Sequence, residues 1–144
     1  MTQDEQEVAE RSAAVMWEGD RASQALGMEL LDVSPGRSTM RMTVREDMVN
    51  GHAIGHGGLT FTLADSAFAF ACNSYDRRTV AAGAEIHFRA PTHLGDVLTA
   101  TATERSREGR SGVYDVEVTG SGPSGATVVA TFVGHSREIG GPFA

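Results

Sequence analysis

One carboxylate stands in an otherwise apolar stretch of the chain. Residues 57–73 read Gly-Gly-Leu-Thr-Phe-Thr-Leu-Ala-Asp-Ser-Ala-Phe-Ala-Phe-Ala-Cys-Asn, and Asp65 is the one charged residue among them. Aspartate is a poor residue for a helix interior, and a buried charge is costly unless it is paired or functional. Asp65 is therefore either a solvated position on the edge of a helix or a reactive carboxylate, and its surroundings in the sequence leave both open.

Two glycines, Gly57 and Gly58, open the same stretch. The first amides of a helix lack internal partners and carry the positive end of its dipole, and glycine lets a ligand approach the backbone closely. Such amides are suited to bind an oxyanion that develops during a reaction. The alternative is that the pair only makes a tight turn with close packing.

Asn50, His52 and His56 precede this stretch. His56 could shape the loop or orient a ligand, whereas we expect His52 to be only a loop residue. The two histidines are four residues apart, but that spacing brings side chains together on a helix, and Gly55 and Gly57 indicate a loop. Because no carboxylate or thiolate nearby completes a ligand set, the sequence predicts no metal site.

The elements that must position these residues follow from hydrophobic periodicity. Residues 57–73 are apolar nearly all round and rich in alanine, which predicts a long buried helix. Residues 4–20 predict an amphipathic helix near the N-terminus. Most of the remaining chain alternates apolar and polar residues, which predicts strands. The strands are expected on either side of Pro35-Gly36 and around residues 84–88, 98–102, 114–118 and 128–132.

Short turn segments separate the later strands, at residues 91–96, 108–112 and 120–125. Connections this short favour an antiparallel meander, and one face of such a sheet needs an apolar cover. The long helix is the one candidate large enough. The sequence therefore predicts an α+β hotdog fold, in which an antiparallel sheet of about six strands wraps around one long central helix, with an extra N-terminal helix.

The length of 144 residues fits one domain with one core, so we expect a single domain over residues 1–144. Within it, residues 1–22 should contain the N-terminal helix and residues 138–144 a flexible tail. A single cysteine, Cys72, excludes an internal disulfide and favours a reducing compartment. The acidic N-terminus is unlike a signal peptide, and no apolar run approaches about 20 residues. We therefore expect a cytoplasmic protein that does not enter membranes.

The formal net charge is −7, and no basic run exists that could neutralise a nucleic-acid backbone. All 12 basic residues are arginine, so chemistry that needs a lysine is excluded. Arg89 and the group Arg105, Arg107 and Arg110 are the candidates for binding a few phosphates of a small ligand, although each could equally be a solvated strand end.

The segment from Asn50 to Asn73, with its His-Gly-Gly, Leu-Ala-Asp and Ala-Cys-Asn motifs, resembles the PaaI thioesterases of phenylacetic acid degradation, within the hotdog superfamily. The strand pattern fits this family out to about Glu138. The resemblance implies hydrolysis of an acyl-CoA, with a phenylacetyl-type acyl group. No separate cofactor is expected, because coenzyme A is part of the substrate.

The resemblance also implies roles for single residues. The Gly57 amide would bind the thioester carbonyl, and Asp65 would attack that carbonyl or activate water. Asn50 would place the water or the acyl group, and His56 would support the loop and the pocket. Related thioesterases have Ser or Thr one turn beyond the carboxylate, where this chain has Ala69.

The spacing between Gly57 and Asp65 adds a geometric argument. Eight residues along one helix correspond to about 12 Å. An oxyanion donor and a nucleophile must each lie about 3 Å from the same carbonyl, so one chain cannot supply both. Two antiparallel copies of the helix would bring them together, and we therefore expect a homodimer with two sites. The geometry leaves open whether dimers pair further, and we expect a dimer of dimers, that is, a homotetramer.

Coenzyme A carries three phosphates, for which Arg89 and Arg107 are the predicted ligands.

Two alternative functions remain within the fold. A hydratase or dehydratase would pair the helix carboxylate with a histidine such as His56. A non-catalytic acyl-CoA sensor would need no reactive carboxylate, and it would need a DNA-binding appendage that this chain lacks.

Overall fold

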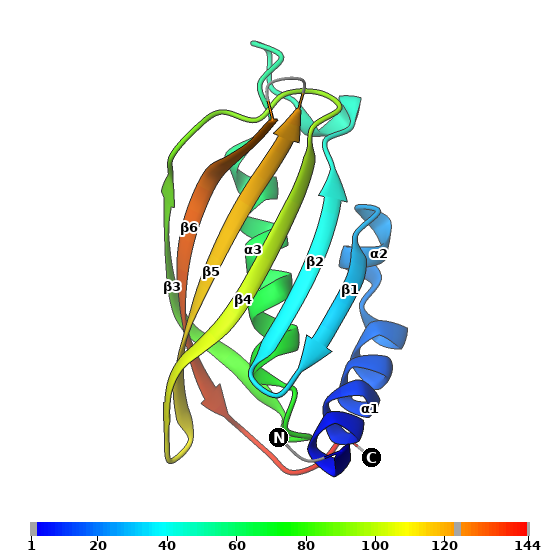
Figure 1. Cartoon of the computed structure of the whole chain (residues 1–144), viewed down its shortest axis with the longest axis vertical. Helices are drawn as coiled ribbons and strands as arrows, with labels where there is room; N and C mark the ends of the chain where they lie inside the picture. Colours follow the sequence, from blue (N-terminus) through cyan, green and yellow to red (C-terminus); the bar gives the residue numbers. More distant parts are fainter. Residues whose placement is uncertain (1–2, 123–124, 144) are drawn as a thin grey trace.

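The computed structural model describes residues 3–122 and 125–143 as one antiparallel sheet that curves around a central helix (Figure 1). The strand order is β1-β2-β4-β5-β6-β3. The predicted six-stranded sheet and long central helix are confirmed. The elements in chain order are α1 (Gln3–Gly19), α2 (Arg21–Ala25), β1 (Glu29–Ser34), β2 (Arg37–Thr43), η1 (Glu46–Met48), α3 (Gly57–Cys72), β3 (Thr79–Phe88), β4 (Val97–Glu108), β5 (Ser111–Gly122) and β6 (Gly125–Glu138).

Helix α3 packs closely on β2, β4 and β5 because small residues line the contact. Ala64, Ala67 and Ala71 have no exposed surface, and neither has Ala100 on β4. The sheet contributes a glycine as well, since a Cβ atom at Gly134 would lie 2.8 Å from the ring of Phe68. No helix in the described residues is long and apolar enough to span a membrane.

The strands bury alternate residues, as the period of two predicts. Both β2 and β5 alternate exposed and buried positions along most of their length. Polar groups also hold α3 on the sheet: Ser38 Oγ donates to the Ala67 carbonyl at 2.6 Å. The largest side chains of the resulting core are Met40, Met42, Leu63, Phe68, Phe70, Leu98, Tyr114, Val116, Val118 and Phe132.

Helix α1 confirms the amphipathic helix predicted over residues 4–20. Within the N-terminal region expected over residues 1–22, a break separates α1 from the short helix α2, and residues 1–2 lie outside the described residues. The break falls at Asp20, whose carboxylate accepts the Ser23 N–H at 3.0 Å and so caps α2. Capping competes with continuation of α1, because the cap residue leaves helical geometry.

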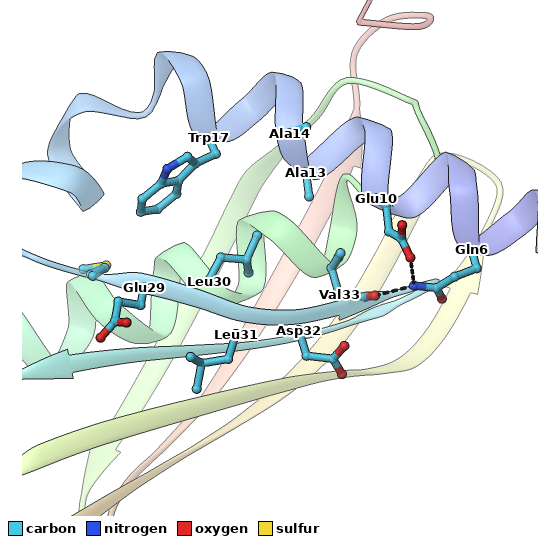
Figure 2. Close-up of a pocket in the computed structure, with 11 residues that line it drawn as sticks. Gln6, Glu10, Ala13, Ala14, Trp17, Glu29, Leu30, Leu31, Asp32 and Val33 are labelled. Atoms are coloured by element: carbon cyan, nitrogen blue, oxygen red, sulfur yellow. Dashed lines mark hydrogen bonds between the residues drawn. The ribbon is translucent and has the colours of Figure 1, made fainter.

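Helix α1 lies along β1 and covers that edge of the sheet (Figure 1). Gln6 Nε2 fixes the contact by donating to the Val33 carbonyl at 2.8 Å. Figure 2 shows the groove that remains between them, about 550 Å³ in volume, with Trp17 and Leu30 among its lining side chains. None of the predicted site residues lines this groove.

The opposite edge strand, β3, pairs with β6 on one side and has no strand partner on its other side in the described residues. Its apolar side chains are exposed there: Val80 is 45% and Phe88 is 56% exposed. A long edge with apolar side chains is a template for pairing with another strand.

The segment after β6 returns toward the end of α3. Ile139 N–H donates to the Arg78 carbonyl, and Phe143 N–H donates to Asp76 Oδ1 at 3.1 Å. The sequence predicts a flexible tail over residues 138–144. In the structure these bonds attach the segment near its beginning and near its end, and residue 144 lies outside the described residues.

The contact between Gly134 and Phe68 gives a test of the packing. Gly134→Ala places a methyl group against a ring that is 1% exposed, so we expect a loss of about 1–3 kcal/mol in the free energy of unfolding. At Gly19 an added Cβ meets nothing within 4 Å, and Gly19→Ala should change stability by less than about 0.5 kcal/mol. Urea denaturation measures both variants, and equal stabilities would contradict the packing described.

Candidate active site

Helix α3 begins at a histidine cap. His56 is the N-cap residue, and its Nδ1 accepts the Gly58 N–H at 3.2 Å. A neutral ring that accepts at Nδ1 carries its proton on Nε2. His56 therefore satisfies one of the free amides of the helix and holds its first turn in place, in agreement with a supporting role.

The amide of Gly57 is the first in α3, and the structure records no acceptor for it among the described residues. It lines a cavity of about 380 Å³, together with Thr60 and Phe88. A Cβ atom at Gly57 would lie 3.0 Å from the Phe88 ring, so only glycine fits there without a shift of that ring. An unpaired helix amide that faces a cavity is suited to bind an oxyanion.

The loop before α3 is held by a contact that the sequence did not reveal. Gly55 N–H donates to the Thr92 carbonyl at 2.8 Å, and a Cβ atom at Gly55 would lie 1.9 Å from Thr92 Oγ1. Both residues also line the cavity at Gly57. In the sequence, this contact is indicated only by the glycine itself, two residues before the helix. A glycine does not indicate which distant residue it contacts.

Asn50 organises the same loop. Its Oδ1 accepts the backbone N–H groups of His52 and Ile54, at 2.9 and 3.2 Å. This bonding pattern is an Asx turn. The side-chain oxygen is therefore engaged within the loop, while Nδ2 remains to donate to a ligand.

The described residues contain no group of three His, Cys, Asp or Glu side chains that could hold a metal ion.

Asp65 lies two turns into α3 and is half-buried. The structure records no hydrogen bond or ion pair for its carboxylate among the described residues. Burial raises the pKa of Asp65 above its ordinary value. A carboxylate with a raised pKa and no partner is better suited to accept a proton or attack a carbonyl than to stabilise the fold.

The two predicted phosphate ligands lie in different places. Arg89 lines the cavity at Gly57, and its Nε and Nη2 donate to Thr131 Oγ1 at 3.2 and 3.1 Å. Arg107 is on the far part of β4, where its guanidinium lies 3.6 Å over the ring of Tyr75. A single chain thus brings Arg89 beside Gly57 and keeps Arg107 away from it.

The comparisons with known proteins agree with this geometry. Residues 52–126, which include α3 and its preceding histidine, match the thioesterase superfamily. The chain is 42% identical to the acyl-coenzyme A thioesterase PaaI of Escherichia coli K12 over 131 residues, 91% of each chain. The chain belongs to the thioesterase superfamily. It is an enzyme that hydrolyses thioester bonds, and the predicted resemblance to the PaaI-type thioesterases is confirmed.

Solved structures of similar proteins have the same fold. The structure of E. coli PaaI, from the phenylacetic acid degradation operon, matches with a TM-score of 0.90 and 41% identity, over 95% of this chain and 97% of that one. A mutant of the phenylacetic acid degradation protein PaaI of Thermus thermophilus matches with a TM-score of 0.78 and 33% identity, over 83% and 100%. The predicted hotdog fold is confirmed.

The raised pKa of Asp65 predicts that this residue lowers the stability of the thioesterase. Because its pKa is higher in the folded than in the unfolded chain, ionisation favours unfolding. The cost is absent below the unfolded value, near pH 4, and is complete once the pH exceeds the folded pKa. We therefore expect Asp65→Asn to melt at a higher temperature than wild type at pH 7, with a smaller difference at pH 4.

The matched control is Asp32→Asn, since Asp32 is an exposed residue of β1. Its melting temperature should follow that of wild type at both pH values. A lower melting temperature for Asp65→Asn at pH 7 would show that the Asp65 carboxylate is stabilised by a partner and would contradict its description as an unpaired charge.

Proposed function

We propose that this thioesterase hydrolyses acyl-CoA thioesters, with the Gly57 amide as the oxyanion donor and Asp65 of the partner subunit as the reactive carboxylate. The observation that carries the proposal is the unpaired, half-buried carboxylate on the same helix as an unpaired amide. The substrate class follows from the similarity to a protein named acyl-coenzyme A thioesterase.

The reaction uses these two groups in opposite ways. As the carbonyl carbon of the thioester becomes tetrahedral, its oxygen gains negative charge that the Gly57 N–H stabilises. Asp65 either attacks this carbon and forms an anhydride, or removes a proton from a water molecule that attacks it. In both routes the carbon–sulfur bond breaks and coenzyme A leaves as the thiolate. In the first route the acyl group stays on Asp65 until water hydrolyses the anhydride, whereas in the second route the attacking water gives the free acid directly. One water molecule is consumed in either case, and the proton it loses ends on the coenzyme A thiol.

A shared site follows from the length of α3. Gly57 and Asp65 lie on one helix, about 12 Å apart along its axis. Antiparallel pairing of β3 with the same strand of a second chain would continue the sheet through its exposed edge. The two α3 helices would then run antiparallel beside each other, each Gly57 near the partner's Asp65.

An aromatic acyl group is supported by two rings near the site. Phe61 is half-buried, one turn before Asp65, and packs edge-on against Phe132 at 5.3 Å. Phe88 lines the cavity at Gly57. Phe68, one turn after Asp65 on the same helix, is instead buried in the core against Tyr114. The similar E. coli protein comes from a phenylacetic acid degradation operon, and we assign this enzyme a phenylacetyl-type substrate.

We place the enzyme in the cytoplasm, where cysteine thiols stay reduced. Cys72 is buried, and burial raises the pKa of its thiol to about 12, so the thiol stays protonated and unreactive. We further propose that two dimers associate into a homotetramer, which light scattering of the purified enzyme tests directly.

Asp65→Asn should lower kcat for acyl-CoA hydrolysis by about 100-fold or more, since it removes the participating base or nucleophile. The measurement is thiol release from an acyl-CoA at saturating concentration. Asp32→Asn, with the same change of charge on an exposed strand residue, should keep wild-type activity. Full activity in Asp65→Asn would refute the assigned mechanism.

The acyl preference is tested by comparing ring and straight-chain substrates. We expect kcat/KM for phenylacetyl-CoA to exceed that for hexanoyl-CoA by at least about tenfold, or about 1.4 kcal/mol. Phe88→Leu should reduce this ratio, because ring contacts contribute about 0.5–1.5 kcal/mol beyond buried area. Equal or faster hydrolysis of hexanoyl-CoA would remove the aromatic assignment and leave the acyl-CoA thioesterase itself intact.

A further inference from the structure

Three residues of α3 carry hydroxyl groups, and two of these groups are bonded within the protein. Thr62 Oγ1 donates to the Gly58 carbonyl at 2.8 Å, and Ser66 Oγ lies 3.0 Å from Ser23 Oγ. For the third, that of Thr60, the structure records no hydrogen bond among the described residues. Thr60 is only 4% exposed, and polar groups at such positions are nearly always bonded.

The helix itself explains why this hydroxyl has no partner. A threonine inside a helix commonly donates to the carbonyl four residues earlier, which for Thr60 is that of His56. The His56 carbonyl already accepts the N–H groups of Leu59 and Thr60, at 3.0 and 3.5 Å, so both of its lone pairs are used. The Thr60 hydroxyl therefore lacks the helix acceptor that Thr62 has.

The Thr60 hydroxyl opens on the cavity at Gly57. Among the described residues that are not exposed, every side-chain oxygen that is sealed from solvent has a hydrogen-bond partner, so the partnerless Thr60 oxygen is not sealed. Thr60 lines two spaces. One, beside Met42 and Leu98, has no room for a water molecule, and the other is the cavity of about 380 Å³ that Gly57 and Phe88 also line. The accessible side of the hydroxyl thus faces this cavity.

The Gly57 amide lies one turn before this hydroxyl on the same face of α3. Helical side chains lean toward the N-terminus of their helix, which directs the Thr60 side chain toward the first turn. The Gly57 amide also has no recorded acceptor among the described residues. Positions three residues apart on a helix are about 5–6 Å from each other, so a single oxygen can lie about 3 Å from both donors.

The surroundings favour an oxygen that carries negative charge. Among the described residues, those that line the cavity include no Asp or Glu, and most are apolar. Fixed donors in such surroundings stabilise a developing oxyanion more strongly than they would in water.

A second threonine of this cavity, Thr92, is placed differently. The structure records no partner for its hydroxyl among the described residues either, but a Cβ atom at Gly55 would lie 1.9 Å from Thr92 Oγ1. This hydroxyl therefore lies against the loop before α3, whereas that of Thr60 lies on the helix face that bears the Gly57 amide.

We propose that the Thr60 hydroxyl is a second oxyanion donor of this thioesterase, beside the Gly57 amide. The proposal rests on the proposed function, because it requires a thioester carbonyl at Gly57. The Thr60 O–H donates to the carbonyl oxygen as the carbonyl carbon becomes tetrahedral. Thr60 keeps its proton, and no covalent bond to it forms or breaks.

Thr60→Val tests the proposal, because it replaces the hydroxyl by a methyl group of nearly the same shape. We expect kcat for phenylacetyl-CoA to fall at least about tenfold, since an oxyanion donor is lost. KM should stay within about twofold, because the bond strengthens only in the transition state. Thr60→Ser restores the hydroxyl and should keep kcat within about threefold of wild type. The matched control is Thr62→Val, two residues along the same helix, which should keep wild-type kcat.

Thermal melting separates this role from a structural one. The Thr60 hydroxyl bonds nothing in the folded chain, so Thr60→Val should melt at or above the wild-type temperature while its kcat falls. A lower melting temperature together with the lower kcat, and no recovery in Thr60→Ser, would mean that the hydroxyl supports the fold and would overturn the proposal.

Binding of two analogues that the enzyme cannot hydrolyse tests the contact directly. In the difluoroketone analogue of phenylacetyl-CoA, a difluoromethylene group replaces the sulfur, and its carbonyl readily becomes a tetrahedral oxyanion. The phenylethyl thioether of coenzyme A has no carbonyl. By calorimetry, Thr60→Val should bind the difluoroketone at least about tenfold more weakly than wild type does, and the thioether within about twofold of wild type.

An equal loss of affinity for both analogues would show that Thr60 only shapes the cavity, and it would overturn the proposal. Full kcat in Thr60→Val would do the same and leave the proposed function standing, provided that wild type is active. If wild type hydrolyses no acyl-CoA, the proposed function itself fails, and the second donor fails with it.

Discussion

The burial of α3 inside a curved sheet is the constraint on which the rest of this structure depends. The helix approaches the strands closely because alanines such as Ala64 and Ala67 line the contact, and polar tethers such as that of Ser38 to the Ala67 carbonyl hold it. A single charge, that of Asp65, lies on this helix, half-buried and without a recorded partner in the described residues. The fold thus accepts an unfavourable charge at one place, which is where a reactive carboxylate would be needed.

The same helix is the reason that the proposed site needs two chains. Its first amide, that of Gly57, has no acceptor among the described residues and belongs to a residue that lines a cavity, but the carboxylate lies about two turns farther along. The edge strand β3 has no strand partner on its outer side in the described residues, whereas α1 packs against the opposite edge strand, β1. Symmetric pairing through β3 would place two incomplete sites together and make two complete ones.

Sequence reasoning found the features that depend on local pattern. The alanine-rich apolar run predicted α3, and the isolated charge singled out Asp65. It predicted the end of α1 near Asp20 but not the short helix α2 that follows, because five residues are too few to show a helical period. It also did not foresee that Asn50 would bond within its own loop, or that Arg107 would stack on Tyr75. Those contacts depend on where distant segments meet, which period and spacing do not specify.

The central claim, a site shared between two chains, is tested most directly by subunit complementation. Asp65→Asn removes the carboxylate, and Gly57→Pro removes the amide at a position where a helix tolerates proline. The proline requires the Phe88 ring to shift, and this ring is 56% exposed and has room to do so. The backbone of His56, at φ −68° and ψ 125°, also suits a following proline. Each variant alone should be inactive, and an equal mixture after subunit exchange should regain about a quarter of wild-type activity, because half of the dimers are mixed and each has one intact site. Activity no greater than that of the separate variants, after mass spectrometry confirms mixed dimers, would contradict a shared site.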